Sequence, residues 1–320
     1  MPEVIHSVNL DANETAFFAR ELEHIKANTY DVKFPNLKAT SLIPVSTEAG
    51  SGAETITYQQ FTDVGLMKVI ANYADDLPRA DIKGKEFSTP VRSLGGSYGY
   101  NVQEIRAANQ AGRSLTSRKA SSLRKANDQS VNRIAWRARV DDGINGGLQG
   151  LFYNPNITSS TVQTGATSGK VLWEEKLPDE IVKDMMDLID DPRTLTKGVE
   201  DPNQILVPLK QWGIISGTRM SSGTDTTILQ FFLKNRPGVM VDWLNECAAL
   251  DPIPSTLAAG PTDIAISYVK DPLNLTLEIP QPFEQFPVQE RNLEFVIPAH
   301  SRIGGVIVYY PLAVDLIEGI

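Results

Sequence analysis

A serine and a histidine stand in the chain order of one class of hydrolases, and they are the residues that could most readily catalyse a reaction. Residues 95–99 read GGSYG, which satisfies the G-x-S-x-G pattern around Ser97, and His300 follows far downstream. A nucleophilic serine of that class needs a buried apolar strand before it and a helix after it. Here VRSL precedes the glycines and the alternating stretch YGYNVQEI follows the serine. The context argues against catalysis, and we predict no catalytic residue.

Two other patterns suggest phosphate or metal binding. The stretch GATSGK at 165–170 is one residue too short for a phosphate-binding loop, and Val171 stands where such a loop has Ser or Thr. The aspartate doublets at 141–142 and 190–191 could help to hold a divalent cation, but acidic doublets are common at helix ends. Cys247 is the single cysteine, and with three scattered histidines it forms no cluster at zinc-ligand spacing. We therefore expect no cofactor and no metal, and Cys247 reads as an ordinary semi-buried thiol.

The composition is that of a soluble protein with a sizeable core. The chain has 320 residues, of which 41% are hydrophobic, enough for two ordinary domains or one elongated one. No secretory signal is visible at the N-terminus, and no apolar run approaches the ~20 residues that span a bilayer. We expect the chain to be soluble and cytoplasmic when it is made.

Charge is unevenly placed along the chain. Residues 1–160 carry 18 basic and 17 acidic side chains, whereas residues 161–320 carry 12 basic and 22 acidic ones. The sequence pI of about 5.0 argues against a protein that wraps nucleic acid, because counterion release needs a basic surface. The composition still allows local basic patches.

The first 45 residues are typical of an arm. Residues 11–28 predict a short amphipathic helix, with Phe17, Leu22 and Ile25 roughly along one side. Residues 30–45 contain two prolines and predict an extended segment. A first helix packed on its own domain is the alternative.

A long hairpin with a charged tip follows. Residues 54–73 are rich in Thr, Ile, Tyr, Phe and Val, and the charged stretch ADDLPRADIKGKE at 74–86 interrupts them. Strands are expected to return at 87–91 and 97–105. An isolated hairpin is marginal in water, so a projecting one implies that something else covers it.

The longest helix is predicted over 116–145, and it is basic. Residues 113–139 carry eight basic side chains and one acidic side chain, a net charge of +7. This helix is either a solvated face or a surface whose arginines form bidentate pairs with carboxylates of neighbouring subunits. Its small or apolar positions recur at spacings of three and four: Ala120, Leu123, Asn127, Val131, Ile134 and Ala138.

The second half mixes helices and strands. A helix is expected to begin at Pro178 and to stop at Asp191-Pro192. Because the remaining elements do not alternate regularly, the pattern indicates an α+β fold. Further helices are predicted at 212–220 and 226–235, and strands at 204–209, 239–244, 264–269, 275–279, 293–297 and 305–310.

The order of these elements, together with three stretches of sequence, resembles the major capsid proteins of tailed bacteriophages. The stretches are residues 13–60, which resemble the arm and first hairpin strand; residues 134–157, IAWRARVDDGINGGLQGLFYNPNI; and residues 305–320, GVIVYYPLAVDLIEGI. The family's fold is shared with encapsulins and with the floor of herpesvirus capsids. The resemblance covers essentially the whole chain.

The resemblance implies a fold with four parts and a structural function. An N-terminal arm (1–45), an extended hairpin loop (46–97), a peripheral domain with the long spine helix (98–170 and 270–300) and an axial domain (171–269 and 301–320) are expected. Hexamers and pentamers would form an icosahedral phage head around double-stranded DNA, with no enzymatic activity. The residues predicted at subunit interfaces are Arg118, Arg124, Arg133, Arg137, Asp75, Asp76, Arg79, Lys83 and Lys85.

The implied partners are other copies of the chain, scaffolding, portal and decoration proteins, and DNA that is contacted weakly, with no membrane. The shell would assemble in the host cytoplasm and end in the virion. The chain starts almost at the arm, so it is expected to be the mature form or to depend on a separate scaffold. Some relatives link a hairpin lysine to a neighbour's asparagine, but no acceptor is identified for Lys68, Lys83 or Lys85. An encapsulin-like compartment around a cargo enzyme is the alternative function, and a hydrolase acting through Ser97 comes last.

Overall fold

The structure, a computed structural model, describes residues 35–65, 67, 79–111, 116–141, 143, 145–249 and 262–320. From Leu37 onward these residues belong to one unit. The helix predicted over 11–28, most of the predicted arm, and Lys68, Asp75 and Asp76 lie outside the described residues. None of the helices described is long and apolar enough to span a membrane.

A five-stranded sheet has the order β5 (Thr158–Thr161), β14 (Val314–Glu318), β8 (Ile264–Tyr268), β6 (Gln204–Val207) and β7 (Met240–Trp243). The central strand β8 runs antiparallel to both its neighbours, and the two outer pairs are parallel. Every residue of β14, β8 and β6 is buried, so this sheet is covered on both faces.

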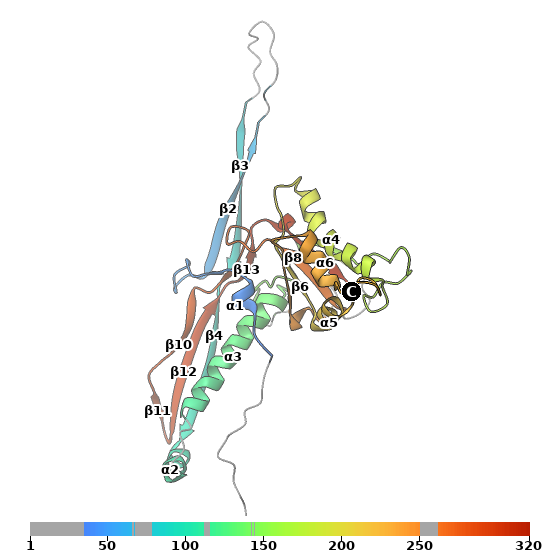
Figure 1. Ribbon diagram of the computed structural model, residues 1–320. Coiled ribbons are helices and arrows are strands. Elements are labelled where there is room, and N and C mark those ends of the chain that lie inside the picture. Colours follow the sequence, from blue (N-terminus) through green and yellow to red (C-terminus); the bar gives the residue numbers. More distant parts are fainter. Residues whose placement is uncertain are drawn as a thin grey trace, which may run out of the picture. The chain divides into compact units, whose positions relative to one another are not determined.

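Three helices pack against one face of this sheet: α4 (Pro178–Leu195), α5 (Leu209–Gly217) and α6 (Ile228–Asn235) (Figure 1). A capping box starts α6, because the Thr227 hydroxyl accepts from the Gln230 N–H while the Gln230 side chain accepts from the Thr227 N–H. The three helices were predicted from the sequence, with boundaries that differ by a few residues.

A second sheet is built on one long ladder. Strands β4 (Arg92–Asn101) and β12 (Glu294–Ile303) pair antiparallel over all ten residues. On the other edge of β12, β10 (Gln281–Gln285) and β11 (Gln289–Arg291) each pair with part of its length. This continuous ladder supports the long helix described next.

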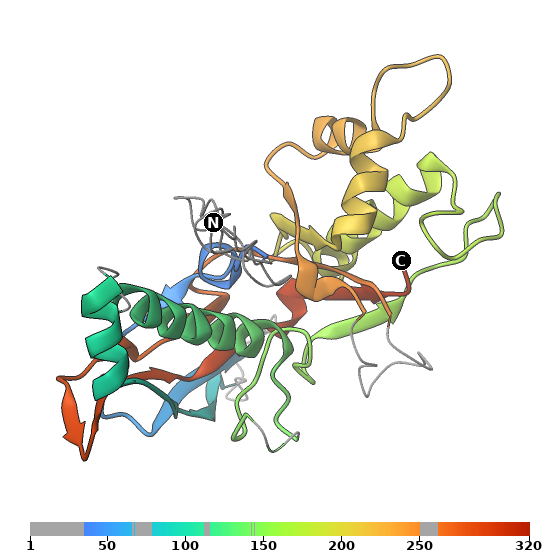
Figure 2. The same cartoon turned by 90° about the horizontal axis from the view of Figure 1, so that it is seen from below.

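Helix α3 (Thr116–Arg137) packs along β4 (Figures 1 and 2). A Cβ on Gly96 would come within 2.7 Å of Leu123 Cδ1, so the absence of a side chain there lets the helix approach the strand closely. The predicted apolar stripe is confirmed near the end of the helix, where Val131 and Ile134 are buried.

A small sheet joins the other parts. It has the order β1 (Val45–Ser46), β9 (Leu275–Glu278) and β13 (Gly305–Val308), with β1 parallel and β13 antiparallel to β9. One-turn helix α1 (Ala39–Leu42) precedes β1, where an extended segment was expected. The Ala39 N–H donates to Asn132 Oδ1 at 3.0 Å, which ties α1 to α3. Two short 3-10 helices, η1 (Asn245–Cys247) and η2 (Pro311–Ala313), complete the elements.

The predicted hairpin is present as a two-stranded ribbon of β2 (Thr55–Val64) and β3 (Asp81–Pro90). Among the described strands, β2 and β3 pair only with each other, and the ribbon extends from the other described elements (Figure 1). The interruption predicted over 74–86 is wrong at its end, because β3 begins at Asp81. Cross-strand partners such as Thr62 opposite Lys83 extend the pairing into this charged stretch.

Helix α3 ends at Arg137 instead of 145. The chain folds back, and the N–H groups of Leu151, Phe152 and Gly150 donate to the carbonyls of 135, 136 and 138. These carbonyls lie in the region where a longer helix would use them internally. A Cβ on Gly150 would lie 2.6 Å from the Ala138 nitrogen, so glycine permits the return.

A strand predicted over 97–105 is also wrong in its second half, because α2 (Val102–Ala111) begins there. Asn101 Oδ1 accepts from the Glu104 N–H at 2.6 Å, and Glu104 Oε2 accepts from the Asn101 N–H at 3.4 Å. This reciprocal cap fixes the start of the helix, and its Asn-x-x-Glu spacing was visible in the sequence.

Edge strand β7 has its outward backbone groups satisfied at Trp243. The Trp243 N–H donates to Asp242 Oδ1 at 2.8 Å, and Lys38 Nζ donates to the Trp243 carbonyl at 2.7 Å. Lys38 also pairs with Asp242 at 2.9 Å and lies 3.6 Å from the centre of the Trp243 ring. One lysine thus protects the end of an exposed sheet edge.

Helix α4 was predicted to stop at Pro192, but it continues to Leu195. Proline has no N–H, so the Leu188 carbonyl loses its partner within the helix. The buried Ser267 hydroxyl of β8 donates to that carbonyl at 2.5 Å. A hydroxyl from the neighbouring sheet therefore compensates for the proline.

We predict that Ser267→Ala lowers the free energy of unfolding of the subunit by about 1–2 kcal/mol, because it leaves a buried carbonyl without a donor. Urea unfolding followed by circular dichroism measures the change. The control is Ser130→Ala, whose hydroxyl bonds to the Ala126 carbonyl on the exposed side of α3; it should change stability by less than about 0.5 kcal/mol. Equal effects of the two substitutions would contradict this role of Ser267.

Candidate assembly surfaces

Helix α3 presents exposed basic side chains on more than one side. Arg118, Arg124 and Arg133 are exposed. Within the described part of the chain, neither Arg124 nor Arg133 has an ion-pair partner. Arg124 lines a groove of about 430 Å³ together with Phe283 and Gln285 of β10. The exposed arginines of α3 are available for contact with another molecule.

Two other basic residues of α3 are engaged inside the chain. Arg137 was predicted at a subunit interface, but its guanidinium donates to the Glu246 carbonyl at 3.0 and 2.7 Å and to the Ala248 carbonyl at 2.5 Å. Lys119 pairs with Glu104 at 3.0 Å. These two cations stabilise the subunit itself.

The thiol enclosed by the Arg137 contacts is inert. Cys247 is fully buried, and burial raises the pKa of its thiol well above the usual value. The pKa shift and burial agree with an ordinary structural cysteine.

The two faces of the ribbon differ in chemistry. Lys83 and Lys85 are exposed on one face of β3, and Lys85 Nζ lies 4.7 Å from the centre of the Phe87 ring. Phe61 and Ile82 project from the other face, each 65% exposed. Arg79 is exposed just before β3. Large exposed apolar side chains on a projecting element indicate a surface that is covered in an assembly.

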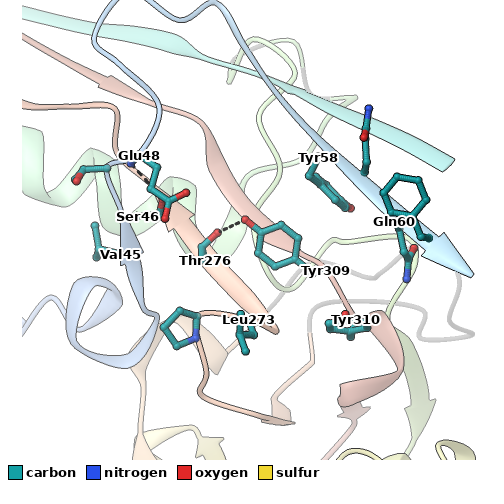
Figure 3. Close-up of a pocket in the computed structure, with 13 residues that line it drawn as sticks. Val45, Ser46, Glu48, Tyr58, Gln60, Leu273, Thr276, Tyr309 and Tyr310 are labelled. Carbon is teal, nitrogen blue, oxygen red and sulfur yellow. Dashed lines mark hydrogen bonds between the residues drawn. The ribbon is translucent and has the colours of Figure 1, made fainter. Parts of the chain in front are cut away.

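A groove of about 780 Å³ lies at the base of the ribbon (Figure 3). Tyr58 of β2 and Tyr309 form part of its wall, with an edge-to-face contact at 4.9 Å between ring centres. The sequence reasoning missed this groove. The adjacent tyrosines at 309 and 310 were a signal, but only the fold brings them to β2 and to Glu48.

The glycine-rich stretch at 165–170 surrounds an anion from its own chain. Glu180 accepts from the N–H groups of Thr167 at 2.7 Å and Ser168 at 3.0 Å, and from the Ser168 hydroxyl at 2.5 Å. It also accepts from the Leu177 N–H at 3.1 Å. These hydrogen bonds, the Ser168 hydroxyl first, lower the pKa of Glu180 to about 2. The donors that a phosphate would need are already used.

The surroundings of Ser97 do not suit a catalytic nucleophile, and those of Asp141 and Asp190 in the aspartate doublets do not suit a cation site. Ser97 lies in the middle of β4 opposite Pro298, and not at a turn between a strand and a helix. Asp190 accepts from the Arg236 guanidinium, and Asp141 pairs with Arg139 at 3.4 Å. Asp190 and Asp141 therefore each have a cation from their own chain, and Asp142 lies outside the described residues.

Comparison with known proteins identifies the architecture. The family model of the major capsid protein matches residues 65–320. No curated protein sequence matches the chain significantly. The family match spans the ribbon from the end of β2, both larger sheets and all the helices from α2 onward.

Solved structures are similar over nearly the whole chain. The capsid of Myoviridae phage XM1 has a TM-score of 0.80 at 19% identity, and the aligned region covers 95% of this chain and 99% of the XM1 chain. The capsid of a native GTA particle has a TM-score of 0.61 at 10% identity, covering 94% and 96%. A structure of Mycobacterium phage Ogopogo has a TM-score of 0.58 at 12% identity, covering 93% and 96%. The predicted α+β capsid fold is confirmed.

We predict that Glu180 keeps its charge to unusually low pH. Its folded pKa is depressed, so the stabilisation is complete above the ordinary glutamate value near 4.5 and is lost as the pH falls towards about 2. A carboxyl ¹³C NMR titration measures the midpoint. Ser168→Ala removes the strongest hydrogen bond and should raise it; an unchanged midpoint in this variant would refute the assignment.

The contacts of Arg137 predict that replacing it destabilises the subunit more than replacing Arg133. Arg137→Ala should lower the free energy of unfolding by about 2 kcal/mol, because charged hydrogen bonds to two carbonyls are lost. Arg133→Ala, on the exposed side of the same helix, should change it by less than about 0.5 kcal/mol. Urea unfolding of both variants provides the comparison, and equal losses would show that Arg137 has no special structural role.

Proposed function

Since the chain belongs to the major capsid protein family and forms the shell of a phage head, we propose that its hexamers and pentamers tile an icosahedral shell around double-stranded DNA. The family match over residues 65–320 carries this proposal. The same match does not favour an encapsulin-like compartment around a cargo enzyme. Repetition of one modest contact around a closed symmetric shell would supply the stability of the particle.

The proposal extends to the partners and the place of assembly. Scaffolding, portal and decoration proteins are proposed to act with the shell, which assembles in the host cytoplasm. A chain with a pI of about 5.0 would contact the packaged DNA weakly. The function is structural and not enzymatic, in keeping with the position of Ser97 within a paired strand.

We keep the four proposed parts of the fold, with one adjustment. The ribbon lies in the proposed hairpin loop (46–97), and α3 lies in the proposed peripheral domain (98–170 and 270–300). We extend the proposed axial domain (171–269 and 301–320) to include β5, because this strand pairs with β14. The arm (1–45) remains as proposed.

We assign two surfaces to contacts between subunits. One is the exposed basic surface of α3, on more than one side of the helix, with Arg118, Arg124 and Arg133. The other is the ribbon, with Arg79, Lys83 and Lys85, and its proposed tip residues Asp75 and Asp76. Arg137 is the internal exception, because its donors are used within the chain.

Reversing the charge of two exposed arginines of α3 should block assembly without unfolding the subunit. Arg124→Glu with Arg133→Glu removes exposed charges worth under about 1 kcal/mol within one subunit. A similar loss at each contact recurs around every capsomer, so we expect closed particles to fall at least about tenfold. Electron microscopy counts the particles formed by wild type and variant, and urea unfolding checks the subunit.

Two comparisons show whether charge is the cause. Arg124→Lys with Arg133→Lys keeps the charge and should retain most of the particles. Raising the ionic strength should partly restore the Glu variant, because the screening length falls below about 10 Å. If the Glu variant gives as many closed particles as wild type, these arginines are merely solvated. Wild-type protein that never forms closed particles would refute the proposed function.

A further inference from the structure

We propose that the groove at the base of the ribbon binds an arginine or lysine side chain of a second copy of this chain. The inference rests on the proposed function, because it assigns a partner to one surface of the shell protein. The groove lies along β2, the segment after β1 and the turn around Leu273 (Figure 3). Its walls are aromatic and its charged groups are acidic, which is the chemistry that recognises an organic cation.

The aromatic wall is held in place before any partner arrives. The Tyr58 ring stacks on Phe87 at 5.1 Å and meets the Tyr309 ring edge-on at 4.9 Å. The Tyr309 N–H donates to the Asn274 carbonyl at 2.8 Å, and its hydroxyl lies 3.0 Å from the Thr276 hydroxyl. A rigid wall reduces the ordering cost of binding.

Two carboxylates give the groove its negative charge. Glu48 lines it directly, and Glu278 is buried behind it and accepts from the Thr276 hydroxyl at 2.7 Å. The pKa of the Tyr309 hydroxyl is raised, chiefly by burial and further by these two carboxylates, so both act on the same wall. No basic side chain is present among the described residues that line the groove, and within the described ranges Glu48 has no ion-pair partner.

The rim of the groove exposes large apolar side chains. Leu273 is 75% exposed and Phe61 is 65% exposed, with Tyr310 and Val45 also partly open to solvent. A free lysine or arginine in solution would leave this rim uncovered, whereas a protein segment would cover it and exclude water from the cation. An arginine between aromatic rings gains more from such desolvation than an exposed one.

A second copy of the chain supplies the complementary charge. Arg124 and Arg133 are exposed on α3 and lack an ion-pair partner within the described residues. The groove has acidic groups without a cation among the described residues that line it, and Arg124 and Arg133 are exposed cations without an ion-pair partner. In a shell made of one repeated chain, each copy brings both surfaces to its neighbours.

The chemistry can be tested on the soluble subunit by NMR with two small probes. N-acetyl-arginine amide should shift the ring signals of Tyr309 and Tyr310 at millimolar concentrations, whereas N-acetyl-citrulline amide, its neutral isostere, should not. Glu48→Gln should reduce the apparent affinity about threefold or more, and Asp225→Asn, which removes an exposed carboxylate elsewhere, should leave it unchanged. Equal shifts with both probes, or with neither, would overturn the cation site even if shells form normally.

The partner can be identified in assembled particles. With Leu273→p-benzoyl-phenylalanine, ultraviolet light should join two copies, and mass spectrometry should find the joined peptide to contain or flank an arginine or lysine. Shells that give only links within one chain, or links to peptides without a basic residue, would overturn the second copy as partner. Wild-type protein that forms no shells at all would instead count against the proposed function, so the two failures are distinguishable.

Discussion

Burial of the last turn of α3 is the constraint on which the arrangement of the other elements depends. Ala135 and Trp136 are completely buried, and the Trp136 ring stacks on Phe152 at 5.3 Å. Asn132, one turn earlier, accepts from the backbone of α1 and donates to Glu246. Arg137 reaches the carbonyls around η1. One helical turn thus fixes the position of α1, the return at 148–152 and the segment after β7. Since packing here is tight, a change in this turn would be transmitted to all three.

Local sequence patterns predicted the elements whose stability is mainly local. The spacing of Val131 and Ile134 predicted the buried stripe of α3, and the β-branched residues at 54–64 predicted β2. The capsid fold followed from the order of elements and from resemblance, and not from any chemical motif. At two places where the sequence reasoning was wrong, a distant group had replaced a local one. Ser267 compensates for Pro192, and Gly150 lets the chain return over the end of α3.

The candidate surfaces were predictable only in part, because they too depend on contacts between distant parts of the chain. A run of arginines can be read from the sequence, but the sequence does not show which of them meet carbonyls of their own chain. Arg133 and Arg137 are four residues apart, and one is exposed while the other has three internal hydrogen bonds. The groove at the ribbon base brings Tyr309 to Glu48 and Tyr58, which lie far earlier in the chain. No periodicity predicts such a meeting, because it depends on the packing of β1, β2 and β9.

The contacts of Lys38 have a consequence for a subunit that is not yet part of a shell. A sheet with a bare edge can add a strand from any copy, and such growth is open-ended where a shell must close. At Trp243 the N–H and the carbonyl that face outward are already bonded to Asp242 and Lys38. A second strand would first have to break a charged contact stacked on an indole ring. Lys38, which lies just before α1, therefore also opposes fibre-like association at this edge, and contact between copies through side-chain surfaces is favoured instead.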